Sequence, residues 1–272
     1  MKTILISGRR KSGKSTLAQF LIDHQQILFP GKSVYRAPFA APIKNFCVDI
    51  LGLPYELVWG SDEQKETLTH YRWEDMPHYL DICHRIAFEV ATRNGMSFDY
   101  TFESYLRSVT RGLAKPILRL LSSSAAQEEY FQLLPVGPMT IRQIQQEVGT
   151  GMGRKMDPDL WVDSWERMNY FPEDTDRVAI ADDLRFGNEL DMGHEVGAFC
   201  LRLTRGRTGD NHPSETSLAD DDPRFHSVLD NKSLSLRQTV GQLLAALCYD
   251  GVVPFDAAEA CLDALDQAGV AE

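Results

Sequence analysis

The pattern of hydrophobic and polar positions predicts short buried strands that alternate with amphipathic helices. Continuous apolar runs, typical of strands covered on both faces, occur at residues 3–7 and 178–181, and further strands are expected near 33–36, within 195–203 and over 226–229. Helical spacing predicts helices at 16–22, 41–51 and 141–148, and a closing helix at 234–247 with Leu236, Val240, Leu243, Leu244 and Leu247 facing inward. This alternation indicates an α/β fold with a central parallel sheet covered on both faces.

One long stretch interrupts this pattern. Residues 75–138 are rich in aromatic and helix-forming residues, lack a parallel-strand pattern and end in Pro135-Val136-Gly137-Pro138. The sequence therefore predicts a mostly helical insertion at 75–138 in a core made of residues 1–74 and 139–253. Residues 254–272 are expected to form a short acidic C-terminal helix and a tail.

The stretch Gly8-Arg9-Arg10-Lys11-Ser12-Gly13-Lys14-Ser15 fits the pattern G-x-x-x-x-G-K-[ST] of phosphate-binding P-loops. It lies between a predicted strand and a predicted helix, the context that the pattern requires, which disfavours a mere glycine-rich turn with incidental basic residues. Lys14 is expected to reach the β- and γ-phosphates of ATP, and the Ser15 hydroxyl to hold Mg²⁺. The residues predicted to bind ATP are Lys11, Ser12, Gly13, Lys14, Ser15 and Thr16.

Charged residues follow the predicted strand at 178–181. Asp182 and Asp183 come directly after it, at the end of a parallel strand where α/β proteins bind ligands. They could accept from Mg²⁺-bound water or from a substrate, with Arg185 holding a phosphate, or they could form an ion pair in a solvated turn. Lys44 stands in the first turn of a predicted helix, where the helix dipole does not favour it, so it indicates an anionic partner or a solvated surface lysine.

Three further segments allow two interpretations each. Residues 149–154 form a second glycine-rich turn, which is either an anion nest or a helix stop. Trp161 and Trp165 lie one helical turn apart, a spacing more typical of a core pair than of a surface that stacks a base. Residues 205–223 are polar and rich in Gly and Asp, which suits a mobile lid or an active-site loop. The histidines do not cluster, so no catalytic base is assigned.

Composition limits the partners and the location. The net charge of −11 argues against broad binding to nucleic acid, whereas the local cluster Arg9-Arg10-Lys11 suits a small polyanion. Five scattered cysteines without a C-x-x-C pair indicate reduced thiols, and argue against a disulfide framework or a Cys/His metal site. No apolar run approaches the roughly 18 residues of a membrane span. The first strand leaves no room for a signal peptide, so we expect a cytoplasmic protein, in the host cytoplasm if it is viral.

In their order along the chain, these motifs resemble those of the T-even type of phage deoxynucleoside monophosphate kinase. The likeness covers most of the chain except residues 75–138. Beyond the P-loop it rests on Phe39-Ala40-Ala41-Pro42-Ile43-Lys44, on Ile141-Arg142 through Val148-Gly149-Thr150, on Trp161-Val162, on Asp183-Leu184-Arg185 with Glu189, on His212 with Glu215, and on Leu229-Asp230-Asn231 leading to Ser233-Leu234.

The resemblance implies a three-layer P-loop kinase fold and a transfer of phosphate from ATP, with Mg²⁺, to a deoxynucleoside 5′-monophosphate. Lys65 stands where a relative has arginine, and Gly151 where many relatives carry an acidic residue. The residues expected at the catalytic centre are Lys14, Arg142, Arg185 and Asp183. Those expected to bind the monophosphate are Lys44, Lys65, Arg142, Gly149, Thr150, Trp161, Asp183, Arg185 and Glu189.

Two other functions fit the P-loop pattern. One is another small-molecule kinase, such as a kinase for a coenzyme precursor. The other is a P-loop ATPase that acts as a switch, although neither a water-positioning residue nor a partner surface can be identified for it. The sequence leaves open which bases are accepted, whether ribose is discriminated from deoxyribose, and the oligomeric state, a homodimer included.

Overall fold

The computed structural model describes residues 2–49, 51–73, 136–154, 158–171, 173–205 and 217–267. The chain divides into two compact units. The first, called the α/β unit, comprises Met1–Phe39 and Ser164–Glu272, and the second, called the inserted unit, comprises Ala40–Asp163. Most of the predicted helical insertion at 75–138 lies outside the described residues, so its helical character stays a prediction.

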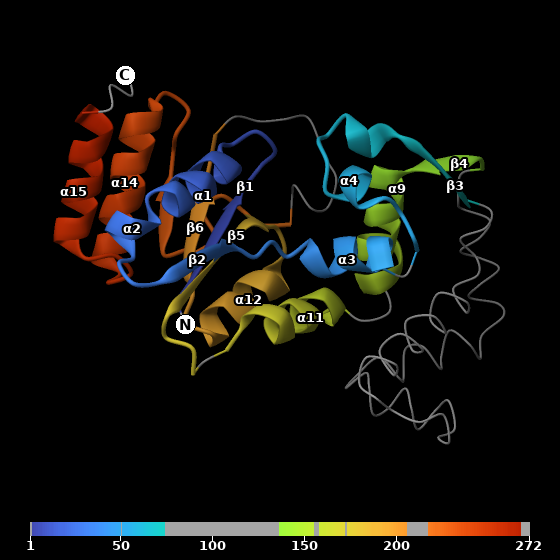
Figure 1. Ribbon diagram of the computed structural model, residues 1–272, viewed down its shortest axis with the longest axis horizontal. Helices are drawn as coiled ribbons and strands as arrows, with labels where there is room; N and C mark the ends of the chain where they lie inside the picture. The colour runs from blue at the N-terminus through green and yellow to red at the C-terminus, as the bar shows by residue number, and fades with distance from the viewer. Residues whose placement is uncertain are drawn as a thin grey trace. The chain divides into compact units, whose positions relative to one another are not determined.

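The α/β unit contains a five-stranded sheet in which every pair of neighbours is parallel, as the sequence predicts (Figure 1). The strand order is β2-β5-β1-β6-β7. Strand β5 is longer than predicted, so Asp182 and Asp183 lie within the strand and not in a turn after it. The strands are β1 (Lys2–Gly8), β2 (Ser33–Arg36), β5 (Arg177–Leu184), β6 (Phe199–Leu203) and β7 (Ser227–Leu229).

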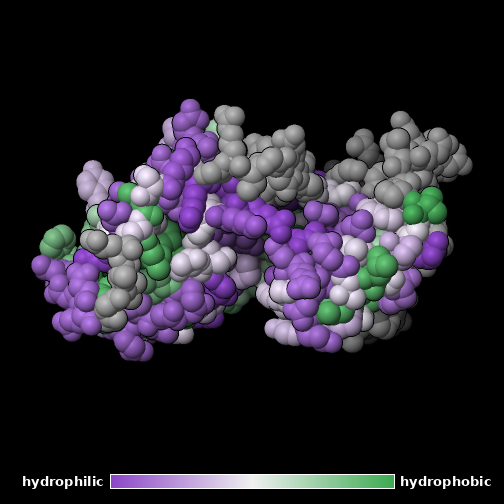
Figure 2. Space-filling view, turned by 90° about the horizontal axis from the view of Figure 1, so that it is seen from above, coloured by the Kyte–Doolittle hydropathy of each residue, from purple (hydrophilic) through white to green (hydrophobic). Residues whose placement is uncertain are grey.

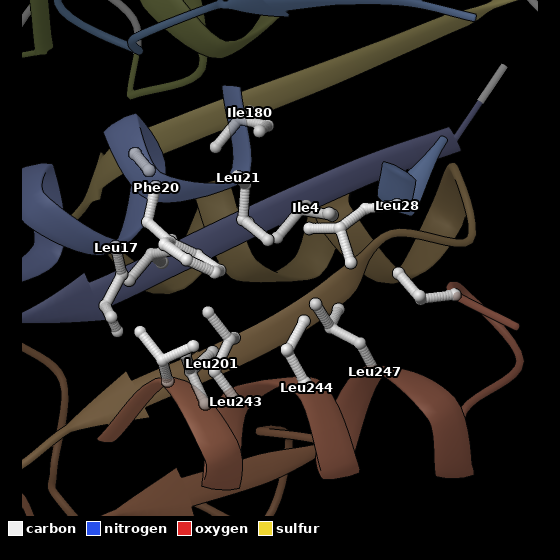
Figure 3. Close-up of a cluster of buried hydrophobic side chains, with 14 of the residues drawn as sticks. Ile4, Leu17, Phe20, Leu21, Leu28, Ile180, Leu201, Leu243, Leu244 and Leu247 are labelled. Carbon is white, nitrogen blue, oxygen red and sulfur yellow. The ribbon is translucent and has the colours of Figure 1, made fainter. Parts of the chain in front are cut away.

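Four helices contribute to the apolar cluster on one face of this sheet, and Figure 3 shows part of that cluster beside the strands. Ile4 and Ile180 of the sheet meet Leu17 and Leu21 of the first helix, and leucines of the α14 helix close the cluster. Leu236, predicted to face inward, is 46% exposed instead, because it is the first residue of α14. The helices are α1 (Lys14–Asp23), α2 (Gln25–Leu28), α14 (Leu236–Tyr249) and α15 (Phe255–Gln267).

The opposite face is covered by α12 (Gly187–Glu195) and the part of α11 (Leu160–Asn169) that belongs to this unit. Leu5, between Ile4 and Ile6, points to this face, and a Cβ added at Gly193 of α12 would lie 2.5 Å from its Cδ1. Trp165 is fully buried, stacks on Phe39 with ring centroids 4.8 Å apart, and donates from Nε1 to the Ala37 carbonyl. Helices on both faces of the sheet make the predicted three layers.

The inserted unit has a small apolar core around Cys47, Val58, Met139, Ile144 and Trp161. As predicted, Thr140 caps a helix: its Oγ1 accepts from the Gln143 N–H, and the Gln143 side chain accepts from the Thr140 N–H. This unit also contains an antiparallel pair of strands that was not predicted. The pair joins residues 68–72 to residues 138–140. Its elements are α3 (Ala41–Asp49), α4 (Tyr55–Val58), η1 (Gln64–Glu66), β3 (Leu68–Arg72), β4 (Pro138–Thr140), α9 (Ile141–Gln146) and η3 (Glu147–Gly153).

The face of the molecule seen in Figure 2 carries mostly hydrophilic residues, with a few hydrophobic groups among them. Within the described ranges, the structure contains no helix with both the length and the apolar character needed to cross a membrane.

Candidate functional site

Residues 8–15, called the glycine loop below, lead the chain from the end of β1 into α1. Three of them have positive φ angles: Gly8 at 150°, Lys11 at 61° and Gly13 at 98°. A Cβ at Gly8 would lie 2.6 Å from the Ser12 Oγ and 2.9 Å from the Leu203 carbonyl oxygen, so a side chain has no room there. The loop is therefore shaped by two glycines that the sequence places at its ends.

Lys14 is the first residue of α1, and its side chain is only 8% exposed. Its Nζ donates to the carbonyl oxygens of Gly8, at 2.6 Å, and Arg9, at 2.8 Å, so the ammonium lies against the glycine loop. The first turn of α1 holds no acidic residue, and its N-cap, Gly13, offers no capping side chain. The N–H groups at this helix end, together with the ammonium, suit an anion such as a phosphate.

A buried carboxylate lies on the same face of the sheet as α1. A β-bulge interrupts the pairing of β5 with β1 between Ala181 and Leu184, so the contacts of Asp182 and Asp183 decide where the two carboxylates lie. One nitrogen of Arg36, Nη2, lies 3.4 Å from the Asp182 Oδ2 and donates to the Ser15 carbonyl at 2.9 Å. Asp182 is therefore close to the first turn of α1, whereas Asp183 accepts from the Phe39 N–H at 2.7 Å.

Asp183 is the catalytic carboxylate that the sequence predicts, and that role stays a prediction. The contacts of Arg36 with Asp182 and with the Ser15 carbonyl place Asp182 beside α1. The apolar pattern indicates neither that β5 continues past residue 181 nor that a β-bulge lies there, so it could not point to Asp182.

Arg185 and Glu189 lie at the start of α12. The buried Glu189 carboxylate accepts from the backbone N–H groups of Arg185, at 2.8 Å, and Phe186, at 3.1 Å. The Ser217 hydroxyl donates to the Arg185 carbonyl at 2.8 Å. These bonds give Glu189 a local role in holding the turn between β5 and α12. Its predicted role in binding the monophosphate is not tested by them.

Sequence reasoning missed a buried arginine in β6. Arg202 donates to the Ser7 Oγ at 2.8 Å, to the Leu218 carbonyl at 3.0 Å and, from two nitrogens, to the Asp220 Oδ1. The other Asp220 oxygen lies 4.0 Å from Arg9 in the glycine loop. A charged residue in the otherwise apolar strand Phe199-Cys200-Leu201-Arg202-Leu203 was the available signal, because a buried arginine needs such partners.

Arg142 and Lys65, two basic residues predicted to bind the monophosphate, lie in one cluster with the carboxylates of Asp62 and Glu66. Arg142 of α9 forms ion pairs with Glu66 and with Asp62, the latter at 3.0 Å. Burial alone would lower the pKa of Arg142, but its hydrogen bonds to Glu66 and Asp62 outweigh burial and raise it. Burial lowers the pKa of Lys65, with the Arg142 charge adding to that effect and Asp62 opposing it.

Lys44 and Gly149 have partners within the same unit. The Lys44 Nζ lies 4.3 Å from the centroid of the Trp59 ring, a cation–π contact. Gly149 and Thr150 lie in the π-helical η3, so the prediction of a turn at 149–154 is wrong. The Trp161 Nε1 donates to the Gly149 carbonyl at 3.0 Å, inside the core of the inserted unit. π-Helical turns are frequent at functional sites.

The predicted site residues thus form two sets, each described within its own unit. The α/β unit carries the glycine loop, Asp183, Arg185 and Glu189, and the inserted unit carries Lys44, Lys65, Arg142, Gly149, Thr150 and Trp161. Both tryptophans are buried, which confirms the interpretation of Trp161 and Trp165 as core residues. Residues 206–216 of the predicted lid, with Arg207, His212 and Glu215, lie outside the described residues.

A central five-stranded parallel sheet flanked by helices, with the glycine loop at the carboxyl end of its middle strand, is consistent with a P-loop kinase-like fold. No family model matches the chain. A protein of Acanthamoeba polyphaga mimivirus named "Putative deoxynucleotide monophosphate kinase" is 26% identical to it over 222 residues, which are 80% of this chain and 82% of the relative. This distant likeness supports a nucleotide kinase. It does not test the resemblance to the T-even phage enzymes, so that resemblance stays a prediction.

Proposed function

We propose that this protein transfers the γ-phosphoryl group of ATP to a deoxynucleoside 5′-monophosphate, giving the diphosphate and ADP. The observation that carries the proposal is the glycine loop, in which the buried Lys14 ammonium lies beside the uncapped N-terminus of α1. The name of the mimivirus relative supports the choice of acceptor.

On the donor side, the glycine loop would hold the phosphates of ATP with its backbone N–H groups. Phosphoryl transfer needs positioning and charge neutralisation more than covalent chemistry. Lys14 would act as the electrostatic group, exchanging its bonds to the Gly8 and Arg9 carbonyls for bonds to phosphate oxygens. This exchange would keep the buried ammonium paired both before and after ATP binds.

The oxygen donors near α1 fit Mg²⁺, which prefers hard oxygen ligands and keeps several of its waters. Ser15 would offer its hydroxyl directly, and the buried Asp182 carboxylate would accept from a metal-bound water. When bound, the ion would supply charge neutralisation on the β- and γ-phosphates. Arg36, which contacts both residues, would keep the Asp182 carboxylate oriented toward this end of α1.

On the acceptor side, we propose that Arg142 and Lys65 bind the 5′-phosphate of the monophosphate. The Arg142 guanidinium is planar and already pairs with the carboxylates of Asp62 and Glu66, and the same donors could grip a phosphate. In the α/β unit, Asp183 and Arg185 are proposed to hold the sugar or phosphate, and Glu189 is also proposed to bind the monophosphate. In the inserted unit, the same role is proposed for Lys44, Gly149, Thr150 and Trp161. The acceptor phosphate is ionised at neutral pH, so the reaction needs no protein base.

The test is the identity of the products. The purified protein is incubated with Mg²⁺, ATP and each deoxynucleoside and ribonucleoside monophosphate in turn, and the nucleotides are separated by chromatography. We expect ADP and a nucleoside diphosphate in equal amounts, only when a monophosphate is present. Free phosphate without an acceptor would indicate an ATPase instead. Turnover of a non-nucleotide acceptor alone would indicate another small-molecule kinase.

A further inference from the structure

A single asparagine links the loop after β7 to the glycine loop. Asn231 stands two residues past the end of β7 and is only 4% exposed. Its side-chain Nδ2 donates to the Ser12 carbonyl oxygen at 2.9 Å, across 219 positions of sequence. The bond therefore joins two segments that the fold brings together at the carboxyl ends of β1 and β7, two strands that flank β6 in the sheet.

This bond sets the direction of one backbone N–H in the glycine loop. A peptide group is planar and trans, so its carbonyl and its N–H point in opposite directions. The Ser12 carbonyl points at Asn231, and hence the N–H of Gly13 points away from it. Gly13 also has a positive φ of 98°, a conformation that glycine adopts without a side-chain clash.

The surroundings of Asn231 indicate that its bond to the loop is the reason for its burial. A Cβ added at Gly13 would lie 3.6 Å from the Asn231 Nδ2, so the amide lies directly against the loop. Among the described residues, neither the Asn231 Oδ1 nor the Ser12 Oγ has a hydrogen-bond partner, although both are buried. Buried polar atoms are normally paired, so an asparagine that uses only its donor end is poorly explained by stability alone.

We propose that Asn231 is a positioning residue of the nucleotide site: its amide holds the Ser12–Gly13 peptide so that the Gly13 N–H is directed at a phosphate of the bound nucleoside triphosphate. This inference rests on the proposed function in one respect, namely that the glycine loop binds a triphosphate. It does not depend on the identity of the acceptor.

The experiment compares Asn231→Ala and Asn231→Asp with a matched control, Asn169→Ala. Asn169 is also a buried asparagine of the α/β unit, 8% exposed, whose Nδ2 donates to one backbone carbonyl, that of Trp165 at 2.9 Å. Binding of Mg²⁺-ATP is measured by calorimetry, thermal unfolding by circular dichroism, and KM for ATP and for the monophosphate by steady-state kinetics.

We expect Asn231→Ala to raise the Kd for Mg²⁺-ATP about tenfold, as for the loss of one well-placed hydrogen bond. Asn231→Asp should raise the Kd at least as much, because a carboxylate keeps the shape of the amide but cannot donate, and it adds a negative charge beside the phosphates. In both variants the KM for the monophosphate should stay within twofold of the wild-type value. Asn169→Ala should lower the unfolding temperature and leave the Kd for ATP unchanged.

The proposal is overturned if either folded Asn231 variant binds Mg²⁺-ATP as the wild type does, or if Asn169→Ala weakens ATP binding equally. If Asn231→Ala does not fold, the Kd of the isosteric Asn231→Asp variant for Mg²⁺-ATP decides the test. Failure of the proposed function would look different. A wild-type protein that binds no ATP would remove both conclusions, whereas a wild type that binds ATP and makes no diphosphate would remove only the transfer reaction.

Discussion

Lys14 is a charged residue that the fold buries before any ligand arrives. The two carbonyl oxygens that accept from its ammonium offset part of the cost of removing the charge from water. The same carbonyls belong to the glycine loop, so the arrangement that tolerates the buried lysine also places it where a phosphate would bind.

We predict that Lys14→Ala lowers kcat by about a hundredfold or more, the usual effect of removing one electrostatic donor to the transition state. The variant should keep its fold, as judged by circular dichroism and thermal unfolding. Lys32→Ala is the matched control, because Lys32 also donates to a backbone carbonyl, that of Thr175, but lies just before the amino end of β2. Near-normal turnover of Lys14→Ala would remove the loop lysine from the mechanism.

Lys65 carries a prediction about pH. Burial lowers its pKa below the ordinary value of 10.5, so this lysine loses its charge earlier than an exposed lysine as the pH rises. Because the folded-state pKa lies below the unfolded one, the charged Lys65 disfavours folding at low pH, and that cost disappears as the pH rises past both values. If Lys65 binds the acceptor phosphate, kcat/KM for the monophosphate should fall on the alkaline side.

The Lys65→Arg variant provides the comparison, since arginine stays charged throughout. In a pH series of initial rates at saturating ATP, the variant should keep its kcat/KM into the range where the wild type declines. Identical alkaline limbs for the two proteins would show that another group titrates.

At the level of elements, local signals were sufficient where the deciding interaction is itself local. Thr140 and Gln143 close a capping box three residues apart, so the start of α9 could be predicted from the sequence. The end of β5 could not, because Asp182 and Asp183 are held there by Arg36 and by the Phe39 N–H, more than a hundred residues away in sequence. Pattern alone predicts a polar turn at such a pair.

The candidate site divides in the same way. The glycine loop carries its glycines and its lysine within eight residues, so its position was predictable, whereas its contact with Asn231 was not. The partners of Arg142, by contrast, come from η1 and the turn before it, and the π-helical η3 is tied to Trp161 by a bond to Gly149. Neither arrangement produces a hydrophobic periodicity in the sequence, so neither could be predicted from it.

The capping boxes that begin at Thr140 and at Ser235 give a prediction at this scale. Thr140→Ala in α9 and Ser235→Ala in α14 should each reduce the free energy of unfolding by about 1 kcal/mol. Each substitution removes the hydroxyl that accepts a hydrogen bond from the backbone N–H three residues later. Urea denaturation measures this. Only Thr140→Ala should also raise the KM for the monophosphate, since α9 carries Arg142. An equal rise in Ser235→Ala would mean that general stability governs acceptor binding.

For the whole molecule, the two sets of site residues belong to units with separate apolar cores. Effects of distant, independent substitutions on free energy usually add to within about 0.5 kcal/mol. The residues of the glycine loop and the acceptor residues proposed in the inserted unit should therefore behave as two separate groups in binding experiments.

We predict that Arg142→Ala weakens binding of the monophosphate and leaves binding of Mg²⁺-ATP unchanged, with the reverse for Lys14→Ala. In the double variant, each affinity should equal that of the corresponding single variant. For each variant, calorimetric titration with one ligand at a time measures the Kd for the monophosphate and the Kd for Mg²⁺-ATP. Weaker ATP binding in Arg142→Ala would reassign this arginine to the donor side. Arg237→Ala, which removes an exposed ion pair to Asp266, is the control.

The stacking of Phe39 on Trp165 has a consequence for how this protein could change. The chain leaves the α/β unit after Phe39 and re-enters it at Ser164, and the ring contact fastens these two ends to each other. Because the two ends of the inserted unit connect to adjacent points of the α/β unit, another insert could replace it without a change in the strand order of the sheet. We therefore expect recombination at this one junction to diversify the acceptors that the inserted unit is proposed to bind, while the proposed ATP-binding loop is inherited intact.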